Sequence, residues 1–167
     1  MRTTIGIDVA APPELVYRLA RDVTRWSSLL PHYSRSAVVR VDDGVLVCDF
    51  VARRPFVPVL GLGIPVTWRS RTWHEPATRR LRFQHVAGAT KGMDVTWTIE
   101  PEAGGTRVEI AHDFRPRIPG FAALVDTLFT QPIASRTLAT FKALSEALDE
   151  PGARDASETA ASTNPRS

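Results

Sequence analysis

Hydrophobic and polar residues alternate along the middle of the chain, which is the pattern of strands with one buried face. The alternation is clearest in residues 93–100 and 106–114, where every second residue is apolar. Segments of this kind, rich in β-branched and aromatic residues and separated by turn sequences, predict a meander of antiparallel strands. The predicted strands are residues 37–41, 45–53, 66–74, 81–86, 93–100 and 106–114.

The opening of the chain predicts one more strand, residues 3–9, followed by two short helices. Pro12 and Pro13 suit the first positions of a helix, because the missing N–H has no intrahelical partner there. Pro31 is expected to end the second helix, since the residue before a proline disfavours the α conformation.

From residue 120 to residue 148 the hydrophobic period becomes helical. The apolar positions are Phe121, Leu124, Leu128, Leu138, Phe141, Leu144 and Leu148. Pro132 falls inside this pattern and is expected to kink or split the helix. A sheet with one long apolar helix as its partner is a two-layer α+β architecture, with a hollow between the layers.

The length of 167 residues fits one domain, which we place at residues 1–149. Residues 150–167 contain no aromatic side chain and consist largely of Pro, Gly, Ala, Ser and Thr. Such a composition buries too little apolar surface to offset the entropy of ordering. The sequence therefore predicts a disordered C-terminal tail.

Charge and cysteine content narrow the classes of function. The net charge of +3 is small and the arginines are scattered, so we expect no nucleic-acid partner. The single cysteine, Cys48, excludes an internal disulfide and is interpreted as a small buried apolar residue. No apolar run reaches the roughly 20 residues of a transmembrane segment. No signal-peptide core is present either, so we expect a cytoplasmic protein.

Several segments together resemble a known superfamily: the opening of the chain and residues 68–71, 83–86 and 92–97. They are similar to the START-like helix-grip superfamily, and most similar to bacterial polyketide aromatase/cyclases and the related polyketide cyclase/dehydrase and lipid-transport proteins. The resemblance spans residues 5–148. It implies a seven-stranded antiparallel sheet wrapped around a long C-terminal helix, two short helices after the first strand, and a deep cavity.

The resemblance places Tyr33 where the aromatase/cyclases carry a proposed functional tyrosine, so Tyr33 is a candidate catalytic residue. A phenol with an ordinary pKa near ~10 donates a hydrogen bond at neutral pH rather than acting as a base. Packing at a helix–strand junction is the alternative role.

Three residues of the strand 66–74 are implied to line the cavity. Trp68 and Ser70 fall on the cavity-lining tryptophan and serine of the aromatase/cyclases, and Thr72 stands where those enzymes have an inward arginine. The alternation places Arg69 and Arg71 on the other face of the sheet unless a β-bulge shifts the strand.

Strand directions in the meander bring several inward residues to one edge of the sheet. The residues expected at this mouth are Trp68, His85, Met93, His112 and Phe114. The first turn of the long helix, with Phe121 and Leu124, is expected to cover them as further ligand-binding residues. We expect the cavity to have a volume of roughly 300–1,000 Å³.

His85 and His112 are the two histidines expected inside. His85 is either satisfied by a neighbour or exchanges a proton with a phenolic or carbonyl ligand, which makes it the second catalytic candidate. Two histidines without a third ligand at a recognisable spacing predict no metal site. His32 is read as a turn residue or a rim contact, and His74 as exposed.

Residues 54–65 are markedly apolar for a predicted loop. The loop either folds back onto the core, closes as a lid over an apolar ligand, or touches a carrier protein or a membrane.

Two functions from different classes remain open. One is an aromatase/cyclase-like enzyme that binds a hydrophobic aromatic or polyketide ligand and promotes its cyclisation and dehydration, with an acyl carrier protein as a further partner. The other is a non-catalytic carrier or sensor of a lipid, quinone or similar molecule. An interaction protein that docks elsewhere is third. A Gly-rich phosphate loop and a G-x-S-x-G elbow are both absent, and no cofactor is expected.

Overall fold

Every strand expected from the alternation is present in the computed structural model, which describes residues 1–57, 62–116 and 120–150. Seven strands form one antiparallel sheet in the order β1-β7-β6-β5-β4-β3-β2. Their bounds are β1 (Arg2–Val9), β2 (Tyr33–Asp42), β3 (Val45–Val57), β4 (Leu62–Glu75), β5 (Arg80–Gly88), β6 (Met93–Glu102) and β7 (Gly105–Phe114). The predicted α+β helix-grip architecture is confirmed.

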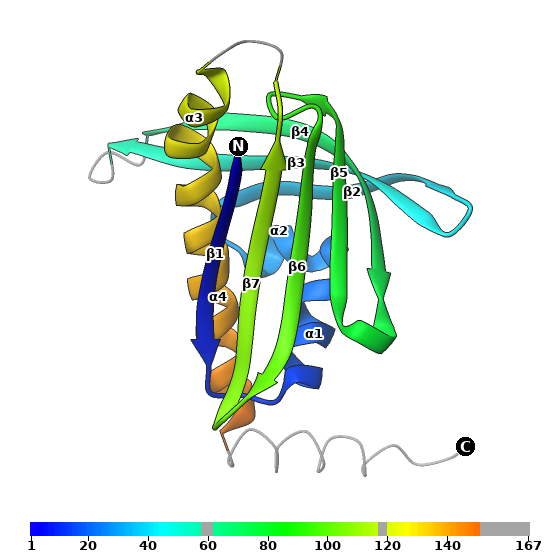
Figure 1. Cartoon of the computed structure of the whole chain (residues 1–167), viewed down its shortest axis with the longest axis vertical. Coiled ribbons are helices and arrows are strands. Elements are labelled where there is room, and N and C mark those ends of the chain that lie inside the picture. The colour runs from blue at the N-terminus through cyan, green and yellow to red at the C-terminus, as the bar shows by residue number, and fades with distance from the viewer. Residues whose placement is uncertain (58–61, 117–119, 151–167) are drawn as a thin grey trace, which may run out of the picture.

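The helical segments lie on one side of this sheet (Figure 1). Two short ones follow β1: α1 (Pro13–Arg21), and a 3₁₀ turn (Val23–Arg25) that runs into α2 (Trp26–Leu29). A long C-terminal helix consists of α3 (Phe121–Val125), a π-helical segment (Asp126–Thr130) and α4 (Gln131–Asp149). Helix α4 packs against α1 and against β1 and β3, which lie in different halves of the bent sheet. The sheet therefore curves around the helix.

The π-helical segment ends two positions before Pro132, the proline that was expected to kink or split the helix. Pro132 has no N–H to donate, and its ring clashes with the preceding turn of a regular α-helix. A π-helical turn widens the backbone spiral and relaxes this crowding. The helix consequently changes type over Asp126–Thr130 and continues as α4.

The apolar segment at residues 54–65 was expected to be a loop, and this is wrong for most of its length. Strand β3 continues to Val57 and β4 begins at Leu62, with an irregularity in their pairing between Pro55 and Val57. Pro55 is tolerated because β2 pairs with β3 only as far as Ala52, so its missing N–H leaves no bond to β2 unmade. The tip, residues 58–61, and the expected tail beyond Glu150 lie outside the described residues.

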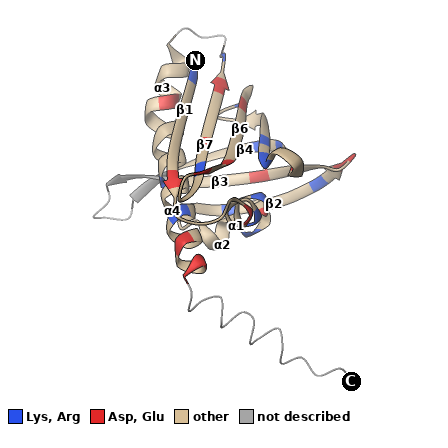
Figure 2. Cartoon of the chain, turned by 60° about the horizontal axis from the view of Figure 1, so that its bottom comes forward, with Lys and Arg blue, Asp and Glu red and all other residues tan. Residues whose placement is uncertain are grey.

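Basic and acidic side chains are both scattered over the strands and helices (Figure 2). Arg69 pairs with Asp49 through two bonds of 2.6 and 2.9 Å. Arg107 of β7 likewise bonds Asp8 at 2.7 Å. These exposed pairs contribute little to stability individually, so burial in the concave face must supply most of it.

The core is centred on Trp26, the first residue of α2. Its indole packs between the sheet and α4. Its ring is 5.5–5.9 Å from the rings of Tyr33, Phe50, Phe83, Trp97 and Phe141. The indole Nε1–H donates to the carbonyl of Ala20 at 3.0 Å, so burial leaves no unsatisfied donor on this side chain.

Removing the Phe141 ring tests whether α4 is held by this cluster. Phe141 is buried, and replacing it by Ala should lower the free energy of unfolding by about 3–5 kcal/mol through lost burial and a residual cavity. Urea unfolding measures the change. The matched control is Phe121→Ala in α3, where the ring is 36% exposed and the loss should be about 1 kcal/mol or less. Equal losses for the two variants would contradict the packing described.

Candidate functional site

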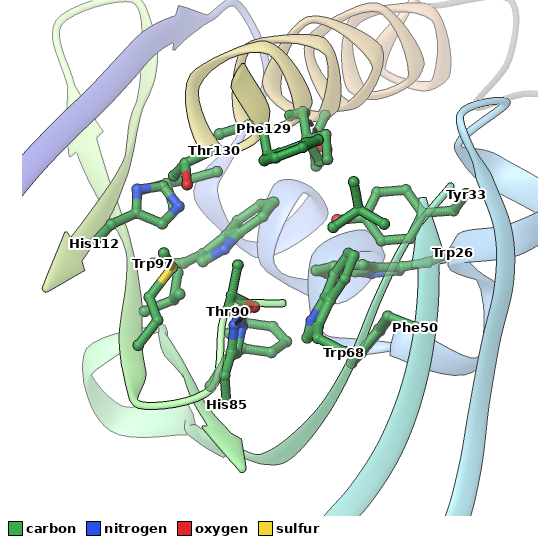
Figure 3. Close-up of a pocket in the computed structure, with 18 residues that line it drawn as sticks. Trp26, Tyr33, Phe50, Trp68, His85, Thr90, Trp97, His112, Phe129 and Thr130 are labelled. Atoms are coloured by element: carbon green, nitrogen blue, oxygen red, sulfur yellow. Dashed lines mark hydrogen bonds between the residues drawn. The ribbon is translucent and has the colours of Figure 1, made fainter. Parts of the chain in front are cut away.

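A cavity of about 70 Å³ lies between the concave face of the sheet and the long helix. Its walls are mostly aromatic and aliphatic, and polar groups appear at a few positions (Figure 3). The aromatic lining residues are Trp26, Tyr33, Phe50, Trp68, Phe83, Trp97 and Phe129. The polar ones, besides the phenol of Tyr33, are His85, Thr90, His112, Thr130 and Thr137.

Five of the residues predicted at the site line this cavity together. They are Tyr33, Trp68, His85, Met93 and His112. They come from β2, β4, β5, β6 and β7, so the strand directions read from the meander place inward residues correctly at this edge. Their roles toward a ligand remain predictions.

Three other predicted residues are buried but do not line the cavity. Ser70 and Thr72 share the inward row of Trp68, but lie further along β4. Ser70 donates to the carbonyl of Gln84 at 3.2 Å. Phe114 packs against Phe121, with ring centroids 6.4 Å apart.

The expectation that Phe121 and Leu124 cover the site is wrong. Their side chains are 36% and 52% exposed, because α3 extends past the cavity. The helix instead contributes Phe129 and Ile133, together with Thr130, Ala134 and Thr137. The last three are small residues four and three positions apart, a spacing that marks one helix face. That signal was present in the sequence and was missed.

The β-bulge that could have turned an arginine inward lies in the neighbouring strand. The pairing of β4 with β5 passes from Arg69 opposite Ala87 to Ser70 opposite His85, so Val86 is the extra residue. The alternation of β4 is unbroken, and Arg69 and Arg71 remain exposed. No cationic side chain from β4 therefore enters the cavity.

The cavity is much smaller than expected because aromatic rings fill it. The Trp68 ring stacks on the rings of Phe50 and His85, with centroids 5.4 and 5.7 Å apart. The Tyr33 ring makes a T-shaped contact with the Trp68 ring at a centroid distance of 5.9 Å. Trp68 is only partly buried, so one side of this stack faces outward.

The turn between β5 and β6 positions His85 against Thr90. The backbone N–H of Gly92 donates to the carbonyl of His85 at 2.8 Å and folds the turn back over the strand. Gly88 adopts φ +90°, and a Cβ there would lie 2.2 Å from the carbonyl oxygen of Thr67, so only glycine fits. As a result, Nδ1 of His85 lies 2.6 Å from the Thr90 hydroxyl. Burial lowers the pKa of His85 to about 3, and this imidazole is neutral at pH 7.

His112 is the second buried imidazole of this wall, and its Nδ1 has no hydrogen-bond partner in the described part of the chain. Burial lowers its pKa to about 4, although nearby Asp126 acts in the opposite direction. Asp126 belongs to the π-helical segment. It accepts hydrogen bonds from Thr3 at 3.0 Å and Gln131 at 2.9 Å.

Tyr33 faces the histidines from the opposite side of the cavity (Figure 3). Burial raises its pKa well above the ordinary value of 10, and the nearby Thr137 hydroxyl opposes the rise in part. The phenol thus keeps its proton at neutral pH, as expected.

His32 was read as a turn residue or a rim contact, and it is instead a third buried histidine, 4% exposed. Its Nε2 lies 2.9 Å from the Thr137 hydroxyl on α4. His74 is exposed and Cys48 is buried, both as expected.

Among the residues that the structure describes, no group of three or more His, Cys, Asp or Glu side chains is arranged to hold a metal ion. Within the same residues, no helix is long and apolar enough to cross a membrane.

The fold that encloses this cavity, a bent sheet around a long helix, is matched by known proteins. Residues 1–146 match the family described as polyketide cyclase/dehydrase and lipid transport. The chain belongs to that family. The match covers nearly all of the described residues, and it confirms the family implied by the sequence resemblance.

Solved structures share the fold of this family member. The Zhui aromatase/cyclase from Streptomyces sp. R1128 is 17% identical, with a TM-score of 0.75 over 91% of this chain and 97% of that one. A START superfamily protein from Mycobacterium smegmatis is 14% identical, with a TM-score of 0.63 over 88% and 98%. At these identities the likeness concerns the fold alone.

The di-domain aromatase/cyclase BexL from the BE-7585A biosynthetic pathway is 28% identical, with a TM-score of 0.69. The match covers 90% of this chain and 48% of BexL, so the chain spans about half the length of that protein.

The three buried histidines predict that the protein loses stability as the pH falls below about 6.5. Their pKa values are lowered to about 4, 3 and 4 in His32, His85 and His112. In the unfolded chain a histidine binds a proton below its ordinary pKa of about 6.5, which favours unfolding. Each should contribute about 1.4 kcal/mol per pH unit between about pH 6 and pH 5.

Urea unfolding at several pH values measures this slope. His85→Gln should remove about one third of it, whereas His74→Gln, a change at the exposed histidine, should leave it intact. A wild-type slope near zero across this range would contradict the description of three neutral buried imidazoles.

Proposed function

We propose that the protein binds a planar, hydrophobic molecule of the aromatic or polyketide type in the cavity between the sheet and the long helix. The observation that carries this proposal is an aromatic wall with uncharged polar groups on opposite sides. His85 and His112 lie on one side and Tyr33 on the other. Such a cavity suits a ring system that carries phenol or carbonyl groups at its ends.

The electrostatics of the lining support an uncharged ligand over a fatty acid. The two imidazoles are neutral at pH 7 and the phenol is protonated. Among the described residues, none that lines the cavity is a Lys or Arg, and Arg69 and Arg71 of β4 are exposed. A carboxylate in this cavity would lack a cationic partner and would lose its hydration.

A ligand larger than the present space requires an aromatic ring to move. Trp68 is the ring best placed to do so, because it is partly exposed and is held by stacking on Phe50 and His85. A planar ligand that takes the place of the indole keeps these stacking contacts, so the exchange costs less than opening the core elsewhere.

Binding is testable with three probes: 2-naphthol, 1,8-dihydroxyanthraquinone and dodecanoate. The first two should quench the fluorescence of the cavity tryptophans in a saturable manner, and dodecanoate should bind more weakly. Ala134→Leu fills the cavity from α4 and should weaken binding about tenfold or more. Ala139→Leu is the matched control, because Ala139 is exposed on the same helix.

Equal binding by both leucine variants would place the site elsewhere. Preferential binding of dodecanoate would favour the alternative function, a non-catalytic lipid carrier or sensor.

Cyclisation of the bound ligand is a second candidate function, and the position of Tyr33 favours it. A protonated phenol in an apolar cavity can donate a hydrogen bond to a ligand carbonyl. As the new carbon–carbon bond of an aldol closure forms, that oxygen gains negative charge and takes up a proton, and the product then loses water. Holding a flexible chain in a reactive fold would supply much of the rate, with His85 as a further proton acceptor.

Tyr33→Phe separates binding from catalysis. Affinity for 1,8-dihydroxyanthraquinone should fall only about fivefold, because one net hydrogen bond is worth about 1 kcal/mol. Cyclisation of a poly-β-ketone thioester, followed by chromatography, should fall about 10²-fold or more if the hydroxyl acts in the reaction. Unchanged cyclisation by the variant would remove Tyr33 from the mechanism.

Two further proposals follow from the same function. An acyl carrier protein would deliver a thioester-linked ligand. The site of action would be the cytoplasm. Both rest on the family resemblance rather than on a feature of the cavity.

A further inference from the structure

His32 is a buried polar side chain that the proposed function does not use. It lies in the turn before β2 and does not line the cavity. Its Nε2 lies 2.9 Å from the Thr137 hydroxyl, and Thr137 is 1% exposed and does line the cavity. His32 can therefore affect a ligand only through neighbours that line the cavity, and Thr137 is the one it hydrogen-bonds.

The Thr137 hydroxyl has one proton and two polar atoms within hydrogen-bond distance. It donates to the carbonyl of Ile133 at 2.8 Å, a bond between residues of α4. It also lies 2.9 Å from Nε2 of His32, and the same hydroxyl opposes the rise in the pKa of the Tyr33 phenol. Because its proton goes to Ile133, the hydroxyl must accept hydrogen bonds from any other partner.

This arrangement fixes the tautomer of His32. A neutral imidazole has one N–H, and the nitrogen that faces an accepting hydroxyl must carry it. The ring of His32 also packs edge-on against Tyr33, with centroids 5.0 Å apart. His32 thus contacts both members of the pair that presents a phenol to the cavity.

We propose that His32 is a positioning residue for Tyr33, and that its Nε2–H anchors the Thr137 hydroxyl and thereby sets the direction in which the Tyr33 hydroxyl points. With one lone pair of Thr137 Oγ1 occupied by His32, the Tyr33 hydroxyl has a defined neighbour on the helix side. The orientation of the Tyr33 hydroxyl is thereby set from the helix side of the cavity. The consequence for ligand binding rests on the proposed function, whereas the hydrogen-bond network does not.

The network is testable without any ligand because the chain has two tyrosines. Tyr17→Phe removes a buried hydroxyl that has no partner in the described residues, and it leaves Tyr33 as the single reporter. In protein labelled with ¹³Cζ-tyrosine, His32→Leu and Thr137→Val should move the Tyr33 resonance in the same direction. The double variant should move it no further than Thr137→Val alone, because both changes break one chain of contacts. His32→Gln, which can still donate, should keep the wild-type position.

A His32→Leu protein that is folded but has an unmoved Tyr33 resonance would overturn the proposal, as would additive effects in the double variant. A second measurement needs no variant. Long-range ¹H–¹⁵N spectra of the wild-type histidines should show His32 as the Nε2–H tautomer. The Nδ1–H tautomer would also overturn the proposal, even if His32→Leu does not fold.

Binding of 2-naphthol gives the functional arm of the experiment. His32→Leu and Thr137→Val should each weaken it about fivefold, the effect of one net hydrogen bond, and His32→Gln should restore most of the loss. If wild-type protein binds neither 2-naphthol nor 1,8-dihydroxyanthraquinone, the proposed function fails, and the tyrosine and histidine spectra still decide the role of His32. Binding with unchanged affinity in His32→Leu would contradict the positioning role alone.

Discussion

The rest of the structure depends on the contacts that the indole of Trp26 makes. It touches rings from β2, β3, β5, β6 and α4, so a single side chain joins both halves of the bent sheet to the long helix. Edge-to-face and tilted ring contacts of this kind add to the gain from apolar burial. Trp26 and four of these rings, those of Tyr33, Phe50, Phe83 and Trp97, also line the cavity. Fold stability and the shape of the site are therefore set by one cluster.

Most of the fold could be predicted from the sequence, because each strand has its own period and turn signals. The alternation in β6 and β7 fixes which residues face inward, and the period change after Gly120 locates the helix. The extension of β3 and β4 beyond residue 53 was missed because Pro55 and Pro65 suggest a loop. A strand tolerates proline wherever no neighbouring strand needs its N–H, and this depends on the sheet order rather than on the local sequence. The π-helical segment before Pro132 was also missed, since its cause is local crowding rather than a residue pattern.

The site was predicted in part: the residues that the strands contribute were found, and those that the long helix contributes were not. Strand periodicity correctly brought Trp68, His85 and His112 to one wall. Strand periodicity does not show how far the helix extends past the cavity. Phe121 and Leu124 were therefore expected to cover the cavity, but both are exposed. Cavity volume depends on how neighbouring rings stack, which periodicity does not encode. The burial of His32 likewise depends on Thr137, which lies 105 residues away in sequence.

The pairing of β1 with β7 has a consequence for the order in which the molecule forms. The amino group of Met1 bonds the carbonyl of Phe114, 113 residues later, and Ile5 of β1 lies opposite Ile110. During synthesis on a ribosome β1 emerges first, yet its partner strand is made only after five other strands. Closing so long a loop is slow compared with forming local hairpins. The edge of the sheet beside α4 therefore assembles late, and the nascent chain must keep β1 from pairing elsewhere until β7 has emerged.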